Sequence, residues 1–304
     1  MTRQFYTLDV FTADALAGNP LAVVLDAQGL DARRMQAIAR EFNLSETVFV
    51  APPTAAGHRA SIRIFTPGRE IPFAGHPTVG TAVLLGVLDR DGNTGALDLV
   101  LEETVGLVPC AIEIHGPDRG HATFTLPRLP ERLDSLPDNA TLARGLGLTE
   151  ADIGFSRHQP AIYSAGTPFH FVPLRSRDAV TRAQPQGEAF ARAFAGSLPD
   201  GFANAFVYCP EPLSAKHAFH ARMFAPAVGV PEDPATGSAA SAFAGLFMDF
   251  ERPGDGQHRF VIEQGDAMGR PSRITVSLDV EGGGLREARI GGEAVIVSDG
   301  RLRL

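Results

Sequence analysis

The sequence contains no tryptophan and only two cysteines among its 304 residues. Cys110 and Cys209 are far apart in the chain, unlike the closely spaced cysteines of metal motifs. Each of them neighbours a proline in a strand-like stretch, and we expect both to be buried, unreactive thiols. A chain with so few cysteines and no disulfide pattern is expected in the cytoplasm.

Motifs that would indicate a cofactor are also missing. No GxGxxG follows the first expected strand and no P-loop is present, so no nucleotide cofactor is predicted. No GxSxG elbow is present, which disfavours a serine hydrolase. The nine histidines show no HxxxH spacing beside a carboxylate, so no metal site is predicted. The following histidines are instead expected on the surface or in loops: His115, His121, His217 and His220.

The charge balance of the chain is acidic. The 35 Asp and Glu residues outnumber the 27 Lys and Arg residues, which gives a net charge of −8. No basic cluster reverses this balance, and nucleic acid is therefore not expected as a partner. No apolar run approaches the length of a membrane span, and the N-terminal stretch lacks the apolar core of a signal peptide. The length suits one large domain or two medium ones.

One stretch of the chain occurs twice. Arg63 to Pro72 reads RIFTPGREIP, and Arg222 to Pro231 reads RMFAPAVGVP, so that Arg, Phe, Pro and Pro recur 222 − 63 = 159 residues apart. After a two-residue slip, HPTVGTA from His76 corresponds to DPATGSA from Asp233. Two long copies indicate a duplicated lobe and not a solenoid. An earlier pair of short segments also matches: Gly18-Asn19-Pro20 and Gly166-Thr167-Pro168.

Each copy is expected to be a strand, a Gly/Pro-rich loop and a buried helix. His76 to Leu88 and the apolar run after Ser238 are too apolar for surface helices, which predicts that both lie in a core. Strands cluster between the helices without regular β-α alternation, so the fold class is α+β with mixed sheets. The N-terminus of a helix attracts anions, and a pseudo-twofold axis would bring two such ends to one interface, where an acid could bind.

Three residues are candidates for acid/base chemistry. Glu46, at the mouth of a strand among apolar neighbours, could have a raised pKa; the alternative, which the residues alone favour, is an ordinary hydrogen-bonded glutamate at a turn. His76 opens the first buried helix and is expected to stay neutral there; the alternative is a cap on its own backbone. Asp233 is its counterpart in the second copy, just before Pro234 at a helix start, and the alternative is a plain N-cap.

Three small residues are candidates for binding a carboxylate. Gly237 and Ser238 could present a backbone N–H and a hydroxyl at the second helix start, and Gly75 could do the same at the first. The alternative is that a tight helix start simply requires small side chains.

Several motifs, in this order, resemble the PhzF-like family of phenazine-biosynthesis isomerases, which has the diaminopimelate-epimerase-like fold. The resemblance runs over essentially the whole chain. It rests on AGNPLAVV from Ala17, NLSETVFV from Asn43, RIFTP and PFAGHPTVGTA between Arg63 and Ala82, EDPATGSAA from Glu232, and EQGDAMGRPS from Glu263.

The resemblance implies two pseudo-symmetric lobes, each a mixed sheet wrapped around a central helix. The lobes are expected at 1–126 and 127–287, with the active site in the cleft between them, and the fold suggests that 288–304 return to complete the first lobe. The family's acid/base glutamate corresponds to Glu46, and its other site residues to His76, Asp233 and Ser238, with backbone near Gly75 and Gly237. Catalysis without metal or organic cofactor and a homodimer are also implied.

The function implied is an isomerase that shifts a proton and a double bond on a small, cyclic amino- or hydroxy-carboxylic acid. Two alternatives stay open. An epimerase or racemase would need a second base on the opposite face of the substrate, and the paired thiols that related enzymes use are absent from both helix starts. A non-catalytic protein that binds a small acid would not need Glu46.

Overall fold

The computed structural model describes residues 2–133, 136–195 and 203–304. The chain forms two compact units: Met1–Pro127 with Arg289–Leu304, and Arg128–Ala288. These limits differ by one residue from those expected from the sequence. Each unit is described here by itself.

The first unit is a closed β-barrel. Eight strands pair in the cyclic order β1, β2, β3, β4, β6, β7, β8 and β17, and β17 pairs with β1 to close the ring. The pairs β2–β3 and β4–β6 are parallel and the others antiparallel. The ring strands are β1 Thr2–Val10, β2 Asn19–Val24, β3 Glu46–Ala51, β4 Ala60–Phe65, β6 Gly95–Glu103, β7 Gly106–Gly116, β8 Arg119–Thr125 and β17 Gly284–Arg303. A ninth, short strand, β5 Glu70–Ile71, pairs with β4.

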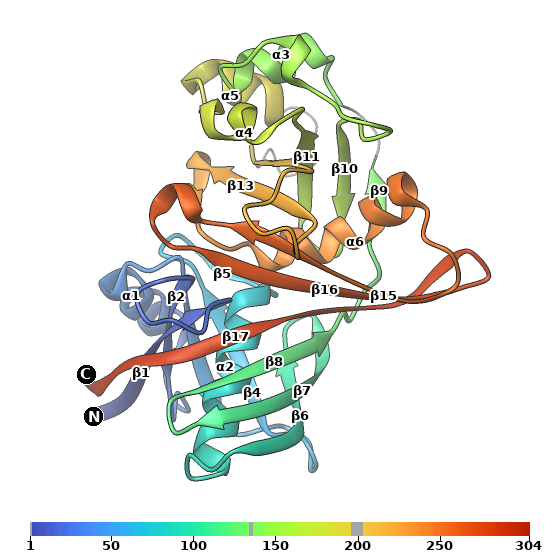
Figure 1. The fold of residues 1–304 in the computed structure, drawn as a ribbon. Coiled ribbons are helices and arrows are strands. Elements are labelled where there is room, and N and C mark those ends of the chain that lie inside the picture. Colours follow the sequence, from blue (N-terminus) through green and yellow to red (C-terminus); the bar gives the residue numbers. More distant parts are fainter. Residues whose placement is uncertain (1, 134–135, 196–202) are drawn as a thin grey trace. The chain divides into compact units, whose positions relative to one another are not determined.

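Helix α2, Gly75–Asp89, lies inside this barrel (Figure 1). Every residue from Gly75 to Val87 is buried, as expected for a helix that is apolar on all sides. Two glycines let the strands come close: a Cβ on Gly80 would lie 2.7 Å from Leu21 Cδ2, and one on Gly86 would lie 3.0 Å from Ile114 Cδ1. The prediction of a core helix from its composition is confirmed.

Helix α1, Ala32–Phe42, packs on the outside of the same barrel. The Asp31 side chain accepts a hydrogen bond from the Arg34 N–H, which caps the first turn. Asn43 ends the helix in the left-handed conformation, with φ 52°. Asp and Asn are typical of these two positions, so the local sequence accounts for both ends.

The second unit contains a run of seven paired strands, in the order β9, β10, β11, β12, β13, β15 and β16. Helix α6, Gly237–Glu251, packs against several of them and is buried over most of its length. The strands are β9 Glu131–Leu133, β10 Ala161–Ser164, β11 Pro168–Pro173, β12 Ala205–Cys209, β13 Phe219–Ala225, β14 Val230–Asp233, β15 Gly256–Gln264 and β16 Ser272–Glu281. Three further helices, α3 Asn139–Gly145, α4 Arg177–Arg182 and α5 Gly187–Phe194, share a separate apolar cluster.

The order of pairings is the same in the two units. In the first, β2 pairs parallel with β3, β3 antiparallel with β4, and β4 parallel with β6. In the second, β11, β12, β13 and β15 repeat this pattern. The central helix connects the last two strands of each set. The repeated sequence segments therefore occupy matching places in the two strand networks.

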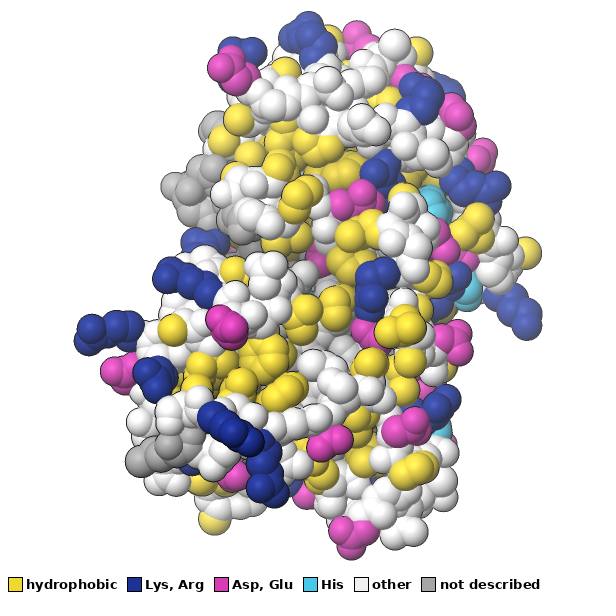
Figure 2. Space-filling view, turned by 90° about the vertical axis from the view of Figure 1, so that its left-hand side faces the viewer, with side chains coloured by type: hydrophobic (Ala, Val, Ile, Leu, Met, Phe, Trp, Pro, Cys, Tyr) yellow, Lys and Arg dark blue, Asp and Glu magenta, His cyan; other side chains and the backbone are white. Residues whose placement is uncertain are grey.

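Charged side chains of both signs are interspersed on the face shown in Figure 2, where the described residues form no continuous basic patch. No helix in the described ranges is long and apolar enough to cross a membrane.

Candidate active site

In the first unit, three polar side chains meet at the start of α2. Glu46 is the first residue of β3, Asn19 the first of β2, and His76 lies in the first turn of α2. Nε2 of His76 lies 3.3 Å from Oε2 of Glu46, and Nδ2 of Asn19 lies 3.3 Å from the other ring nitrogen, Nδ1. Asn19 and His76 are buried, whereas the Glu46 side chain is 17 % exposed. Glu46, His76 and Asn19 therefore form a polar row, of which Glu46 is the accessible end.

This row determines the state of the imidazole. Burial lowers the pKa of His76 to about 3, so the ring is neutral over the usual working range. Because the Asn19 amide donates to Nδ1, the single ring proton belongs on Nε2, the nitrogen that faces Glu46. His76 makes no capping bond at the helix start, since the N-cap is Ala74. The lowered pKa agrees with the neutral histidine predicted from the sequence, although its cause is burial and not the helix end. The capping alternative is wrong.

A second buried carboxyl group lies behind the same helix turn. Oγ1 of Thr78 is 2.9 Å from the Ala74 carbonyl and 2.8 Å from Oε1 of Glu103. A hydroxyl carries one hydrogen, so both contacts are satisfied only if the Glu103 carboxyl donates to Thr78 and Thr78 donates to Ala74. Burial raises the pKa of Glu103 to about 8, which agrees with a protonated acid.

In the second unit, Asp233 ends β14 and accepts a 2.6 Å hydrogen bond from the Thr236 hydroxyl. The Gln264 amide donates to the Asp233 carbonyl and accepts from the Thr236 N–H. These bonds hold Thr236 outside the helix as its N-cap, so α6 begins only at Gly237. The expectation that Pro234 opens the helix is therefore wrong, and so is the alternative of Asp233 as its N-cap, which is Thr236.

Gly237 and Ser238 form the start of α6. The first bond within the helix runs from the Ala240 N–H to the Thr236 carbonyl, so the N–H groups of residues 237–239 precede the helical ladder. Ser238 is half-buried and Gly237 is buried. Gly75 occupies the first position of α2. Each helix start can therefore offer N–H groups to an anion.

The two thiols do not belong to either helix start. Cys110 lies on β7 and Cys209 on β12, and both are free and buried, as predicted. Burial raises the pKa of Cys110 above its ordinary value and that of Cys209 to about 11. Neither thiol is ionised at neutral pH, which disfavours chemistry by a pair of thiolates.

Three polar residues that hold the candidates in place were not predicted from the sequence: Asn19, Glu103 and Gln264. A signal existed only for Asn19, which lies in the repeated Gly-Asn-Pro and Gly-Thr-Pro segments. The expectation that His220 lies on the surface or in a loop is wrong. His220 lies in β13, which pairs with β12 on one side and β15 on the other, and is 5 % exposed.

Comparisons with known proteins agree over the whole chain. The family model for phenazine biosynthesis-like proteins, PhzC-PhzF, matches residues 8–300. An uncharacterized isomerase of Mesorhizobium japonicum is 50 % identical over 301 residues, which cover 99 % of both chains. The trans-2,3-dihydro-3-hydroxyanthranilate isomerase of Pseudomonas aeruginosa is 35 % identical over 303 residues, covering 99 % of this chain and 100 % of that protein.

The match to a solved structure supports the same family assignment. The phenazine biosynthesis protein of the PhzF family from Bacillus anthracis matches with a TM-score of 0.86 and 28 % identity, over 100 % of both chains. These matches show that the chain belongs to the PhzF family of phenazine biosynthesis-like proteins and that it is an isomerase.

Proposed function

We propose that this isomerase shifts a proton and a double bond on a small cyclic amino- or hydroxy-carboxylic acid, with Glu46 as the acid/base residue. The contact between Glu46 and the buried, neutral His76 is the observation that carries the proposal. Glu46 would remove a proton from one carbon and return it to another on the same face of the substrate.

The polar row explains why the proton would stay on Glu46. Nε2 of His76 already carries a hydrogen, and the pKa of the ring is about 3, so His76 cannot accept the proton that Glu46 removes. Its role is then to donate to Glu46 and orient it, after a small rotation that improves the 3.3 Å contact. Asn19 holds the ring in the required tautomer.

We propose that the substrate carboxylate binds the N–H groups at Gly237 and the hydroxyl of Ser238, where the helix end favours negative charge. Gly75 would offer a further N–H at the start of α2. Asp233, oriented by Thr236 and Gln264, would orient a polar group of the substrate or relay a proton. The proposal requires the residues of both units to act on one substrate molecule, within the two-lobed, diaminopimelate-epimerase-like arrangement that the family implies.

Deuterium uptake tests the proposal most directly. The protein is incubated in heavy water with trans-2,3-dihydro-3-hydroxyanthranilate, the substrate named for the Pseudomonas aeruginosa relative, and with a panel of small cyclic amino acids. Mass spectrometry follows deuterium at carbon. We expect product formation with wild type and with Glu41→Gln, an exposed control, and none with Glu46→Gln.

Three results would overturn the assignment. Unchanged turnover by Glu46→Gln would remove Glu46 as the base. Inversion at a single carbon without a shifted double bond would identify an epimerase, although neither His76 nor the buried thiols are suited to act as its second base. Tight binding of an acid with neither product formation nor exchange in wild type would identify a binding protein.

A homodimer, a cytoplasmic location and catalysis without a cofactor stay predictions from the sequence. Light scattering on the purified protein tests the first of them.

A further inference from the structure

The two units share a small structural device, here called the carboxylate latch: a glutamate at the end of a strand that binds the turn before the neighbouring strand. In the first unit, Glu102 accepts hydrogen bonds from the N–H groups of Thr54 and Ala55 and contacts Nδ1 of His58 at 2.7 Å. In the second, Glu263 accepts from Leu213 and Ser214 and contacts Nδ1 of His217 at 2.5 Å. The latch therefore accounts for the position of Glu263 and for its contact with His217.

The latch does not explain His220 and Asp266. In the parallel strand pairs, Ser61 lies opposite Glu102 and His220 lies opposite Glu263, so His220 stands where the first unit has a serine. Asp266 comes from the turn 265–271, whereas the matching turn of the first unit contains only residues 104 and 105. The first unit forms a latch without either group, so these two side chains require another reason.

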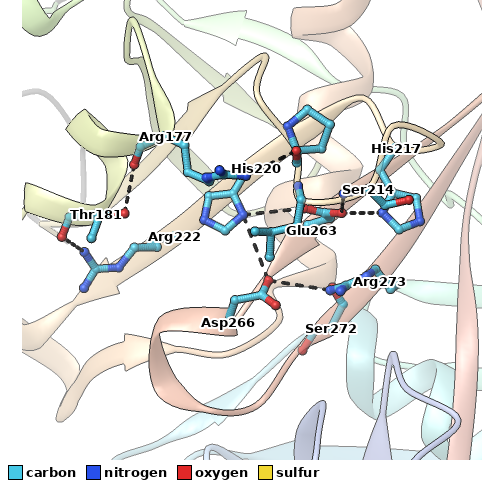
Figure 3. A network of polar contacts seen from close by, with 12 residues as sticks. Arg177, Thr181, Ser214, His217, His220, Arg222, Glu263, Asp266, Ser272 and Arg273 are labelled. Carbon is cyan, nitrogen blue, oxygen red and sulfur yellow. Dashed lines mark hydrogen bonds and ion pairs between the residues drawn. The ribbon is translucent and has the colours of Figure 1, made fainter.

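His220 and Asp266 face the Glu263 carboxylate (Figure 3). Nδ1 of His220 lies 3.7 Å from Oε2 of Glu263 and 4.0 Å from Oδ2 of Asp266. These separations are too long for hydrogen bonds. Nδ1 of His220 and Oδ2 of Asp266 are buried and have no hydrogen-bond partner among the residues that the structure describes. A buried imidazole nitrogen is thus aimed at two carboxylate oxygens without bonding either.

The same separations suit three ligands of one cation. The three ligand atoms lie within 4.8 Å of one another. Around a tetrahedral ion with bonds of about 2.1 Å, ligand atoms are about 3.4 Å apart, so the separations of 3.7 and 4.0 Å from Nδ1 of His220 need to shorten by about 0.3 and 0.6 Å. Oε2 of Glu263 accepts one hydrogen bond, from Leu213, which leaves a lone pair for a metal.

The charges around the cluster are also compatible with a cation. The unbonded Nδ1 of His220 is an imidazole nitrogen, a common metal ligand, and two carboxylates lie near it. Nη1 of Arg273 lies 3.6 Å from Oδ2 of Asp266, but its side chain is 37 % exposed and can turn to solvent. A mixed imidazole and carboxylate set favours Zn²⁺ and similar ions over Mg²⁺ or Ca²⁺, which prefer oxygen ligands alone.

We propose that His220, Glu263 and Asp266 bind one divalent transition-metal ion, with Zn²⁺ as the best match, and that water completes its coordination. The ion would fasten the turn 265–271 to β13 and β15. This turn lies against the candidate-site segment of the second unit, since a Cβ on Gly265 would come within 2.6 Å of the Pro234 carbonyl. Gln264, which holds Asp233 and Thr236, directly precedes the turn.

Metal titration tests the proposal without any enzyme assay. The full chain is stripped with a chelator, dialysed, and titrated with ZnCl2 by calorimetry and with CoCl2 by visible absorption. We expect one ion per chain and the absorption bands of Co²⁺ with nitrogen and oxygen ligands. We also expect Zn²⁺, but not Mg²⁺, to raise the melting temperature.

Two variants and a control locate the ion. Asp266→Asn, which keeps the shape of an exposed turn, and His220→Ala should each weaken Zn²⁺ binding at least tenfold. His115→Ala is the matched control, because His115 lies near two carboxylates at 3.2 and 3.8 Å but is exposed. Absence of stoichiometric binding to wild type, or equal affinity in Asp266→Asn and wild type, would overturn the proposal.

Discussion

The latch of Glu102 and the latch of Glu263 have the same local structure but differ in burial and in the residues around them. Both carboxylates accept two backbone N–H bonds and a histidine contact, at matching places in the strand order. Glu263 is completely buried, whereas Glu102 is 8 % exposed. Around the first latch the neighbours are Ser61 and a two-residue turn; around the second they are polar groups aimed at the carboxylate.

The residues after each latch differ in a way that bears on the candidate site. Glu103 follows Glu102 and contacts Thr78 in the first turn of α2. Gln264 follows Glu263 and holds Thr236, just before α6. An amide and a protonated acid have similar hydrogen-bonding capacity, and the occurrence of Gln in one unit supports a neutral Glu103 in the other. The residues at the matching strand ends therefore support the starts of both helices, α2 and α6.

The largest expected difference between the units is kinetic. Glu46→Gln removes the proposed base of the first unit and should lower kcat by about 10³-fold or more. Ser238→Ala removes a proposed carboxylate contact of the second unit and should raise KM by about tenfold while kcat falls less. Steady-state kinetics on a turned-over substrate distinguish the two, and equal effects on kcat would contradict the division of roles.

The two latches should differ next in stability. Leu213 and Ser214 donate to different oxygens of Glu263, so Glu263→Gln places an amide NH2 against one of these backbone donors in a fully buried site and should cost about 2–3 kcal/mol of unfolding free energy. Glu102→Gln should cost less, because its site is partly exposed. Urea unfolding at pH 7 measures both, and a larger loss for Glu102→Gln would contradict the comparison.

The first latch also predicts a pH dependence. The His58 contact, followed by the Thr54 bond, lowers the pKa of Glu102 to about 2. A lowered folded pKa adds stability that is complete above the ordinary pKa of a glutamate and is lost as the pH falls towards 2. Glu102→Gln should flatten the acid side of the melting-temperature profile, and an unchanged profile would show that the latch contributes nothing there.

Asn19 and its repeat counterpart Thr167 provide a smaller contrast. Asn19→Ala removes the donor to Nδ1 of His76 and frees the ring to adopt the other tautomer, so kcat should fall about tenfold. Thr167→Ala, in the second unit, should leave kcat within about twofold. A loss of activity in both variants would mean that the effect of Asn19 is structural and not tied to His76.

The smallest expected effect is that of Glu103→Gln. The raised folded pKa of about 8 means that the folded state keeps a proton that the unfolded state releases near pH 4.5, so stability falls as the pH rises between these values and then levels off. Gln, as at position 264, avoids this cost, so the variant should lose this decline with pH and have a higher Tm than wild type at pH 8. The same pH profile in the variant and in wild type would show that Glu103 is already ionised when folded.

Much of the fold could be predicted because it depends on neighbouring residues. The α1 helix has its cap at Asp31 and its left-handed end at Asn43, and α2 is apolar on every face. The site was predictable only where a motif marks it, as for Glu46 and His76. The start of α6 was misplaced because a Gln264 side chain 28 residues away keeps Thr236 out of the helix.

The sequence by itself therefore determined the two buried helices, the internal repeat and the family. Only the tertiary structure decided which distant groups meet: Asn19 with His76, 57 residues apart, and Thr7 with Ser298, 291 apart, where β17 returns to close the barrel. It also decided that His220 is buried beside Glu263 and Asp266. Local periodicity records which face of an element is apolar, whereas contacts between polar groups depend on how the strands pair across the whole chain.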